Sequence, residues 1–132
     1  MLCDAHCHVH DERLKDSLKD VLDRCRESNI LWFGICACDE EDWDRLEQFM
    51  TIHSEESITF HPSFGIHPWN TSSVIDSDYL MRLREKLTEY PTAGLGEIGL
   101  CKSKPGLQVP LETQLLRFRQ QLELRIELQR TI

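Results

Sequence analysis

The sequence predicts an α/β fold built from parallel βα units. Its apolar residues switch repeatedly between a period of two, typical of strands, and one of 3.6, typical of helices. The predicted strands begin near residues 2, 30, 58 and 92, and a spacing of about thirty residues is the length of a βαβ unit. Right-handed helical crossovers are therefore expected between the strands. The 132 residues contain no linker or low-complexity tract, so we expect one domain over 1–132.

The first predicted strand lies within residues 1–10 and carries two histidines, His6 and His8. Side chains two residues apart on a strand point to one face, so these imidazoles can share a metal ion. Asp4 and His10 are expected on the same face. The opposite, apolar face would carry Cys3, Ala5, Cys7 and Val9. The alternative is a surface strand with solvated histidines.

A helix, a strand and a second helix are expected next. Residues 14–26 have helical apolar spacing, and residues 30–37 form an apolar run typical of a strand covered on both faces. Asp39 is expected to cap a helix with an acidic first turn, which suits the helix dipole. The buried stripe of that helix is predicted to be Trp43, Leu46, Phe49 and Met50.

The second half repeats the pattern. Residues 58–65 fit a strand that Pro62 keeps short or bulged. A helix over 76–90, capped by Asp76 or Ser77, precedes a strand over 92–97. The last helix is expected over 110–130, with Leu111, Leu115, Phe118, Leu122 and Ile126 on its inward face.

Composition excludes several classes of protein. No apolar run approaches the roughly 18 residues that a membrane span needs. The net charge of −8 disfavours broad contact with a phosphate backbone, so any DNA contact would be local, at a metal site or a small basic cluster. The six cysteines form no CxxC pair and mostly lie in apolar patterns, which indicates reduced thiols in an intracellular protein, cytoplasmic or nuclear.

Three segments lie where predicted strands end, the usual place for functional residues in a βα array. His6 and His8 end the first strand, His67 follows the third, and Glu97 follows the fourth. Gly96 and Gly99 flank Glu97 and would let backbone approach closely. Two histidines and a glutamate are ligands typical of a catalytic divalent-metal site, which activates water as a nucleophile.

Asp4-Ala-His6-Cys-His8, Gly65-Ile-His67-Pro68-Trp69 and Gly96-Glu97-Ile-Gly99-Leu100 resemble, in order and spacing, three signatures of the TatD-type DNases. That family belongs to the amidohydrolase-like metal-dependent hydrolases. The resemblance covers essentially the whole chain. Four positions also resemble the family's helix after strand 4: Gln114, Phe118, Gln121 and Leu122.

The resemblance implies a TIM-type (β/α)8 barrel of which about four of eight units are present. It also implies a nuclease, a metal-dependent 3′–5′ exonuclease or related phosphodiesterase, with two divalent metal ions (Mg, Mn or Zn). On the matching positions, His6 and His8 would hold one metal and Glu97, the catalytic carboxylate, would bridge to the second. His67 would line the substrate pocket, where it could touch phosphate.

The sequence departs from the family pattern in two respects. Cys101 stands where the family usually has Asp, and a thiol lacks the two acceptor oxygens of a carboxylate. A full barrel needs about 250 residues, whereas this chain has 132. The family's later ligands, histidines after strands 5 and 6 and an aspartate after strand 8, have no counterpart here.

Three interpretations stay open. The chain is the N-terminal half of a TatD-type nuclease, a small-molecule phosphoesterase or amidohydrolase, or an inactive half-barrel that acts as an interaction or regulatory protein. Four barrel strands leave open edges and an uncovered inner face, so self-association is expected in any of these cases.

Overall fold

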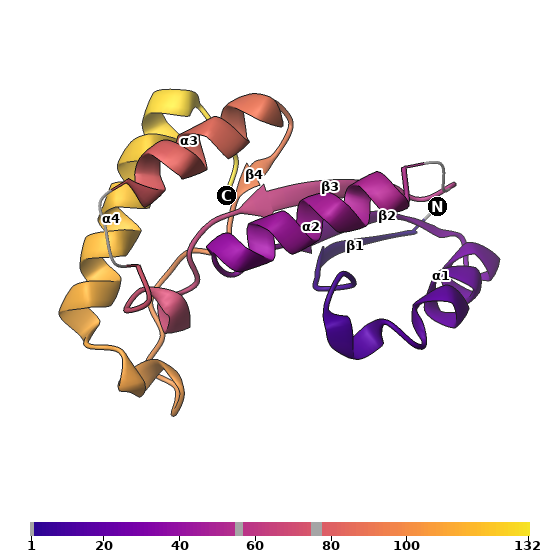
Figure 1. Cartoon of the computed structure of the whole chain (residues 1–132), viewed down its shortest axis with the longest axis horizontal. Helices are drawn as coiled ribbons and strands as arrows, with labels where there is room; N and C mark the ends of the chain where they lie inside the picture. Colours follow the sequence, from indigo (N-terminus) through magenta and orange to yellow (C-terminus); the bar gives the residue numbers. More distant parts are fainter. Residues whose placement is uncertain (1, 55–56, 75–77) are drawn as a thin grey trace.

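The computed structural model describes residues 2–54, 57–74 and 78–132. Four strands, β1 (Leu2–Cys7), β2 (Ile30–Cys36), β3 (Thr59–Phe64) and β4 (Gly94–Leu95), form one sheet in the order β1-β2-β3-β4 (Figure 1). The helices are α1 (Leu18–Glu27), α2 (Glu40–Ile52), α3 (Tyr79–Glu89) and α4 (Leu111–Leu128). Three short 3-10 turns are η1 (Glu12–Leu14), η2 (Pro68–Asn70) and η3 (Gly106–Gln108).

The predicted fold class is confirmed, because every neighbouring pair of strands is parallel and a helix follows each strand. The sheet curls into half of a barrel. The register aligns Phe33 with Phe60 and Cys36 with Ser63, so the strands end close together at their carboxyl ends. The pairing of β1 with β2 shifts between Asp4 and Cys7, which breaks the simple alternation expected of the first strand.

Element boundaries differ from the predicted ones where local capping decides them. The chain turns first through η1, where the Asp11 side chain accepts the Arg13 N–H, and α1 begins only at Leu18. Asp39 caps α2 as predicted, accepting the Asp42 N–H at 2.9 Å. β4 is shorter than the predicted 92–97. The expected caps Asp76 and Ser77 lie outside the described residues.

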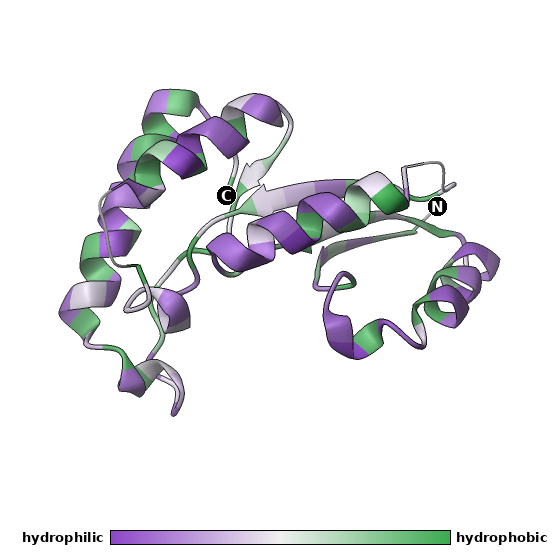
Figure 2. Ribbon diagram, in the orientation of Figure 1, coloured by the Kyte–Doolittle hydropathy of each residue, from purple (hydrophilic) through white to green (hydrophobic). Residues whose placement is uncertain are grey.

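The predicted inward face of α4 is wrong at its two ends, while Leu115, Phe118 and Leu122 between them are half-buried. The buried residues of this helix are Gln114, Gln121 and Leu124, whereas Leu111 is 40% and Ile126 is 68% exposed. The helix is rotated because its two glutamines hydrogen-bond to backbone groups of the loops that it covers. Figure 2 shows hydrophobic and hydrophilic residues mixed along α4, and no helix in the described part of the chain has the length and apolar character of a membrane span.

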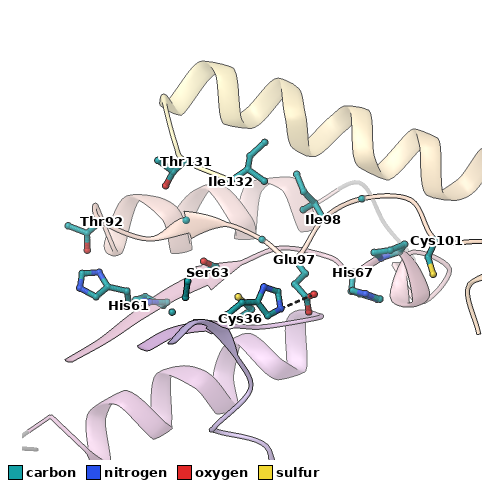
Figure 3. Close-up of a pocket in the computed structure, with 18 of the residues that line it drawn as sticks. Cys36, His61, Ser63, His67, Thr92, Glu97, Ile98, Cys101, Thr131 and Ile132 are labelled. Carbon is teal, nitrogen blue, oxygen red and sulfur yellow. Dashed lines mark ion pairs between the residues drawn. The ribbon is translucent and has the colours of Figure 1, made fainter. Parts of the chain in front are cut away.

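The hydrophobic core lies between the sheet and its helices, on what we call the outer face. Phe33, Ile35 and Phe64 of the strands pack there with Trp43 and Leu46 of α2, and all five are less than 5% exposed. The opposite, inner face is an open hollow of about 730 Å³. Side chains and glycines of all four strands line it, including Ala5, Trp32, Gly34 and Gly94. His61 and Ser63 of β3 also line it and are labelled in Figure 3.

Candidate metal centre

Three side chains predicted from separate motifs meet at the carboxyl end of the sheet. His6 Nε2 lies 3.2 Å from Glu97 Oε1, and His8 Nε2 lies 3.2 Å from Glu97 Oε2. Their side chains are 55%, 37% and 23% exposed, respectively, so solvent reaches the cluster. Two imidazole nitrogens and a carboxylate that face one another from two strand ends form a donor set that suits a catalytic divalent cation.

Backbone hydrogen bonds beyond the strand ends hold this arrangement. Glu97 N–H donates to the Ala37 carbonyl at 3.2 Å, and His67 N–H donates to the Cys38 carbonyl at 2.8 Å. Gly96 N–H donates to Phe64 at 3.0 Å. The segments that follow β2, β3 and β4 are therefore linked to one another, which fixes Glu97 beside the end of β1.

Beside Glu97, close backbone approach requires a glycine at position 65. A Cβ atom at this position would lie 2.9 Å from the Glu97 carbonyl oxygen and 2.9 Å from the Gly96 carbonyl carbon. The sequence had suggested close approach at Gly96 and Gly99 instead. A Cβ at Gly96 would meet only Ser63, at 3.7 Å, while Gly99 has a φ of +152°, which L side chains rarely adopt.

Two members of the predicted polar row do not join the cluster. Asp4 is exposed, and its Oδ1 accepts the backbone N–H of His6. His10 lies after β1 has ended and is only 8% exposed, with its Nε2 at 3.1 Å from Asp42 Oδ1. The prediction of a common face for His10 is wrong because β1 ends at Cys7 and the chain turns before His10.

His67 lies at the entrance to η2, where its Nδ1 accepts the Trp69 N–H at 3.2 Å. Its ring lines both the inner hollow and a second hollow of about 630 Å³ that borders His8 and Arg45. Burial lowers the pKa of His67, which favours the neutral imidazole. The indole of Trp69 meets this ring edge to face and is 48% exposed.

Cys101, which replaces the usual Asp, keeps hydrogen-bond partners of its own. Its Sγ accepts the Trp69 Nε1–H at 3.2 Å and lies 2.9 Å from Ser103 Oγ. The hydrogen bond from Ser103, followed by that from Trp69, lowers the pKa of the Cys101 thiol. The loop that follows Glu97 is therefore linked to the Trp69 indole through the sulfur of Cys101.

The two buried glutamines of α4 explain why this helix borders the site. Gln114 Oε1 accepts the Cys101 N–H at 2.8 Å, and its Nε2 donates to carbonyls of Gly106 and Val109. Gln121 Oε1 accepts the Ile66 N–H at 2.7 Å. One glutamine thus holds the loop after Glu97 and the other holds the segment that leads to His67.

Sequence reasoning missed Cys38. Its Sγ lies 3.4 Å from Glu97 Oε2, the same oxygen that faces His8. Burial, with the charge of Glu97 next, raises the pKa of the Cys38 thiol well above its usual range, so without a cation the thiol is protonated and donates to Glu97. The residue was treated as a small hydrophobe because it follows an apolar strand; its position two residues beyond a strand end was the available signal.

Comparison with known proteins agrees with this architecture. The family model described as TatD-related DNase matches residues 3–132. The crystal structure of YJJV, a TatD homologue from Escherichia coli K12, superposes with a TM-score of 0.76 at 20% identity, covering 98% of this chain and 48% of that one. A TatD-family hydrolase from Entamoeba histolytica gives a TM-score of 0.80 at 20% identity, covering 96% and 46%. The chain thus spans about half the length of these structures.

Proposed function

Since this chain belongs to the TatD-related DNase family, we propose that it is the N-terminal half of a divalent-metal-dependent phosphodiester hydrolase that acts on DNA as a 3′–5′ exonuclease. The observation that supports this best is the convergence of His6, His8 and Glu97 at the carboxyl end of a parallel sheet. A bound divalent cation would act as a Lewis acid and activate water for attack on phosphorus.

The residues of the site would have separate roles in binding cations and substrate. His6 and His8 would hold one cation, and the Glu97 carboxylate, which faces both imidazoles, would be shared with a second. His67, neutral at pH 7 and lining both hollows, would contact the substrate. The same positions fit Mg²⁺, Mn²⁺ or Zn²⁺ through their nitrogen and oxygen donors.

A nucleic-acid substrate is favoured over a small molecule by the surroundings of the cluster. Trp69 offers an exposed indole beside His67, and nucleobases stack on such rings. Arg13 and Arg45 line the second hollow, but Arg13 pairs with Asp11 and Arg45 pairs with Asp42, and acidic side chains outnumber them there. A contact with phosphate would therefore come through cations bound at the cluster. This is the kind of local contact that a protein with a net charge of −8 requires.

We propose that residues 1–132 form an incomplete barrel. We also propose that the protein is intracellular. Most of β1 is exposed, and the inner face is open. Exposed strand edges invite pairing, so self-association or docking with a complementary half is part of the proposal. An inactive interaction module is the alternative, favoured by the same open edge.

The test is a nuclease assay with titrated divalent cations on this chain and on a form extended to a complete barrel. We expect 3′-end degradation of single-stranded DNA by the extended form, loss with Glu97→Ala, and retention with Glu85→Ala, an exposed carboxylate of α3. The 132-residue chain alone is expected to show little activity. An extended form without metal-stimulated nuclease activity would contradict the proposal.

A further inference from the structure

We propose that Trp69 is a stacking platform for one unpaired nucleobase beside the scissile phosphate, so that the site selects single-stranded over base-paired DNA ends. The inference rests on the proposed function and adds a binding subsite and a choice of DNA end to it. Trp69 lies in η2, two residues after His67, and is 48% exposed.

The indole borders the same hollow as two of the candidate metal ligands. His8 and Glu97 line the hollow of about 630 Å³ together with Trp69. The segments around this hollow follow β1, β2, β3 and β4, and loops after parallel strands are where ligands bind in βα arrays. A DNA strand whose phosphate lies at the cation site can therefore place a neighbouring base in the same hollow.

Three contacts hold the exposed indole in place. The Trp69 backbone N–H donates to His67 Nδ1 at 3.2 Å, and the indole Nε1–H donates to Cys101 Sγ at 3.2 Å. The His67 ring meets the indole at an interplanar angle of 82°, with 4.8 Å between the ring centroids. A ring that is already oriented loses little conformational freedom when a base stacks on it, which favours binding.

The short turn that carries Trp69 is itself anchored beside the candidate metal centre. Asn70 Nδ2 donates to the Cys38 carbonyl at 3.2 Å and to Asp39 Oδ2 at 3.0 Å. The His67 N–H donates to the same Cys38 carbonyl at 2.8 Å. These bonds tie η2 to the segment that follows β2, so the platform keeps a fixed position relative to the cluster.

The chemistry of the hollow favours a nucleobase as the group that the indole contacts. The single ring nitrogen of the indole already donates to Cys101, so the exposed ring offers stacking surface, which accepts any base. The two arginines that line the hollow are already paired with aspartates, and the net charge of −8 disfavours direct contact with phosphate. Bases are therefore the part of a DNA strand that this hollow can contact directly.

A stacking platform distinguishes DNA ends by whether their bases are free. Removing a base from a duplex costs free energy, whereas a single-stranded end offers its bases without that cost. The platform therefore favours single-stranded or frayed ends. Since stacking does not read the edges of the bases, we expect no strong preference among the four bases.

Binding of oligonucleotides to the full 132-residue chain tests this inference without turnover. The probes are fluorescein-labelled, cleavage-resistant phosphorothioate strands with one abasic nucleotide at the 3′ end, at the next position, or in the middle of the strand. In Mg²⁺, an abasic nucleotide at one of the two positions nearest the 3′ end should weaken binding about tenfold, measured by fluorescence anisotropy. The central abasic nucleotide should have no effect.

Substitution of Trp69 should remove the same interaction. Trp69→Ala should weaken binding of the intact strand about tenfold and leave binding of the weakened abasic strand unchanged. The preference for a single strand over a blunt duplex should shrink by a similar factor. Trp69→Phe should keep most of the affinity, and Trp32→Ala, in the inner hollow, is the matched control that should change nothing.

The outcomes separate this inference from the proposed function. If Trp69→Ala weakens the intact and abasic strands equally, or weakens neither, the inference is overturned. Failure of the unsubstituted chain to bind any strand overturns it as well, while metal-stimulated nuclease activity of the extended form would still support the proposed function. If Trp69→Ala does not fold, photocross-linking of strands with 5-bromouracil at the last two positions decides: a cross-link at Trp69 supports the inference, and any other result overturns it.

Discussion

The two faces of the sheet differ in how completely this chain covers them. On the outer face, Ile35, Phe64 and Leu95 are fully buried beneath helices. On the inner face, Ala5 is exposed and Trp32 is half-buried, and the hollow between the strands opens to solvent. On β2, Trp32 of the inner face and Ile35 of the outer face thus have different environments.

The outer face therefore carries the residues that stabilise the fold, whereas the inner face carries those of the candidate site. The outer core is built from described residues of the strands and the helices that cover them. The inner face brings the candidate ligands together but leaves them half-enclosed, with His6 55% exposed. Stability and function of this half-barrel are therefore expected to respond to substitutions on different faces.

Substitution of the tryptophan on each face gives the largest contrast. Trp43 is 2% exposed and its Nε1–H donates to the Gly65 carbonyl at 2.9 Å, so Trp43→Ala should lower the free energy of unfolding by about 3–5 kcal/mol. Trp32 stacks on His61 in the open hollow, and Trp32→Ala should cost only about 1 kcal/mol. Urea unfolding measures both; equal losses would contradict the comparison.

Gln121 of α4 connects the outer face with the segment that leads to His67. Gln121→Leu removes the acceptor of the Ile66 N–H, and an unsatisfied buried amide should cost about 1–3 kcal/mol. Hydrogen exchange should accelerate at Ile66 and at His67, which follows it. Gln108→Leu, at an exposed position in η3, is the control and should leave exchange at Ile66 unchanged.

Cys36 lies on the inner side of β2 yet is only 6% exposed, and burial, with Glu97 next, raises the pKa of its thiol to about 11. Below the ordinary value of 9.0 the thiol is protonated in both the folded and the unfolded chain. As the pH rises from about 9 to about 11, the unfolded chain loses this proton first, so stability falls by at most about 1.4 kcal/mol per pH unit.

The Cys36 effect is isolated by comparing variants. Cys36→Ala should flatten the decline of the unfolding free energy over this alkaline range, while Cys3→Ala, at an exposed position, should not. Denaturant unfolding at several pH values gives the slopes. Identical slopes for all three proteins would show that the Cys36 thiol is more accessible to solvent than its 6% exposure indicates.

The smallest effect is expected outside both faces. Arg84 of α3 pairs with Glu127 of α4 through both guanidinium nitrogens, with side chains 42% and 57% exposed. Glu127→Ala should therefore leave the urea midpoint of unfolding nearly unchanged, because solvent screens this exposed pair. The small shift should shrink further at high salt, which urea unfolding with and without added NaCl checks.

The order of elements was predictable because it depends on local periodicity. The run 30–37 and the stripe of Trp43, Leu46 and Phe49 identify a buried strand and its helix without reference to the rest of the chain. The convergence of His6, His8 and Glu97 was also predictable, since carboxyl ends of parallel strands lie at one edge.

The face of α4 was not predictable, because its apolar spacing favours Leu111 and Ile126 while hydrogen bonds to distant loops decide the burial of Gln114 and Gln121. Residues 55 positions apart, Ile66 and Gln121, supply that interaction. Periodicity reports solvent exposure averaged along one element and contains no information about such partners.

The sequence by itself therefore determined the βα order, the parallel sheet and the three motifs that place His6, His8 and Glu97 together. Only the tertiary structure decided that His10 turns away to Asp42 and that Cys38 approaches Glu97 in its place. The physical reason is that these choices depend on where a strand ends and on hydrogen bonds between segments far apart in the chain, and both are settled only when the sheet has formed.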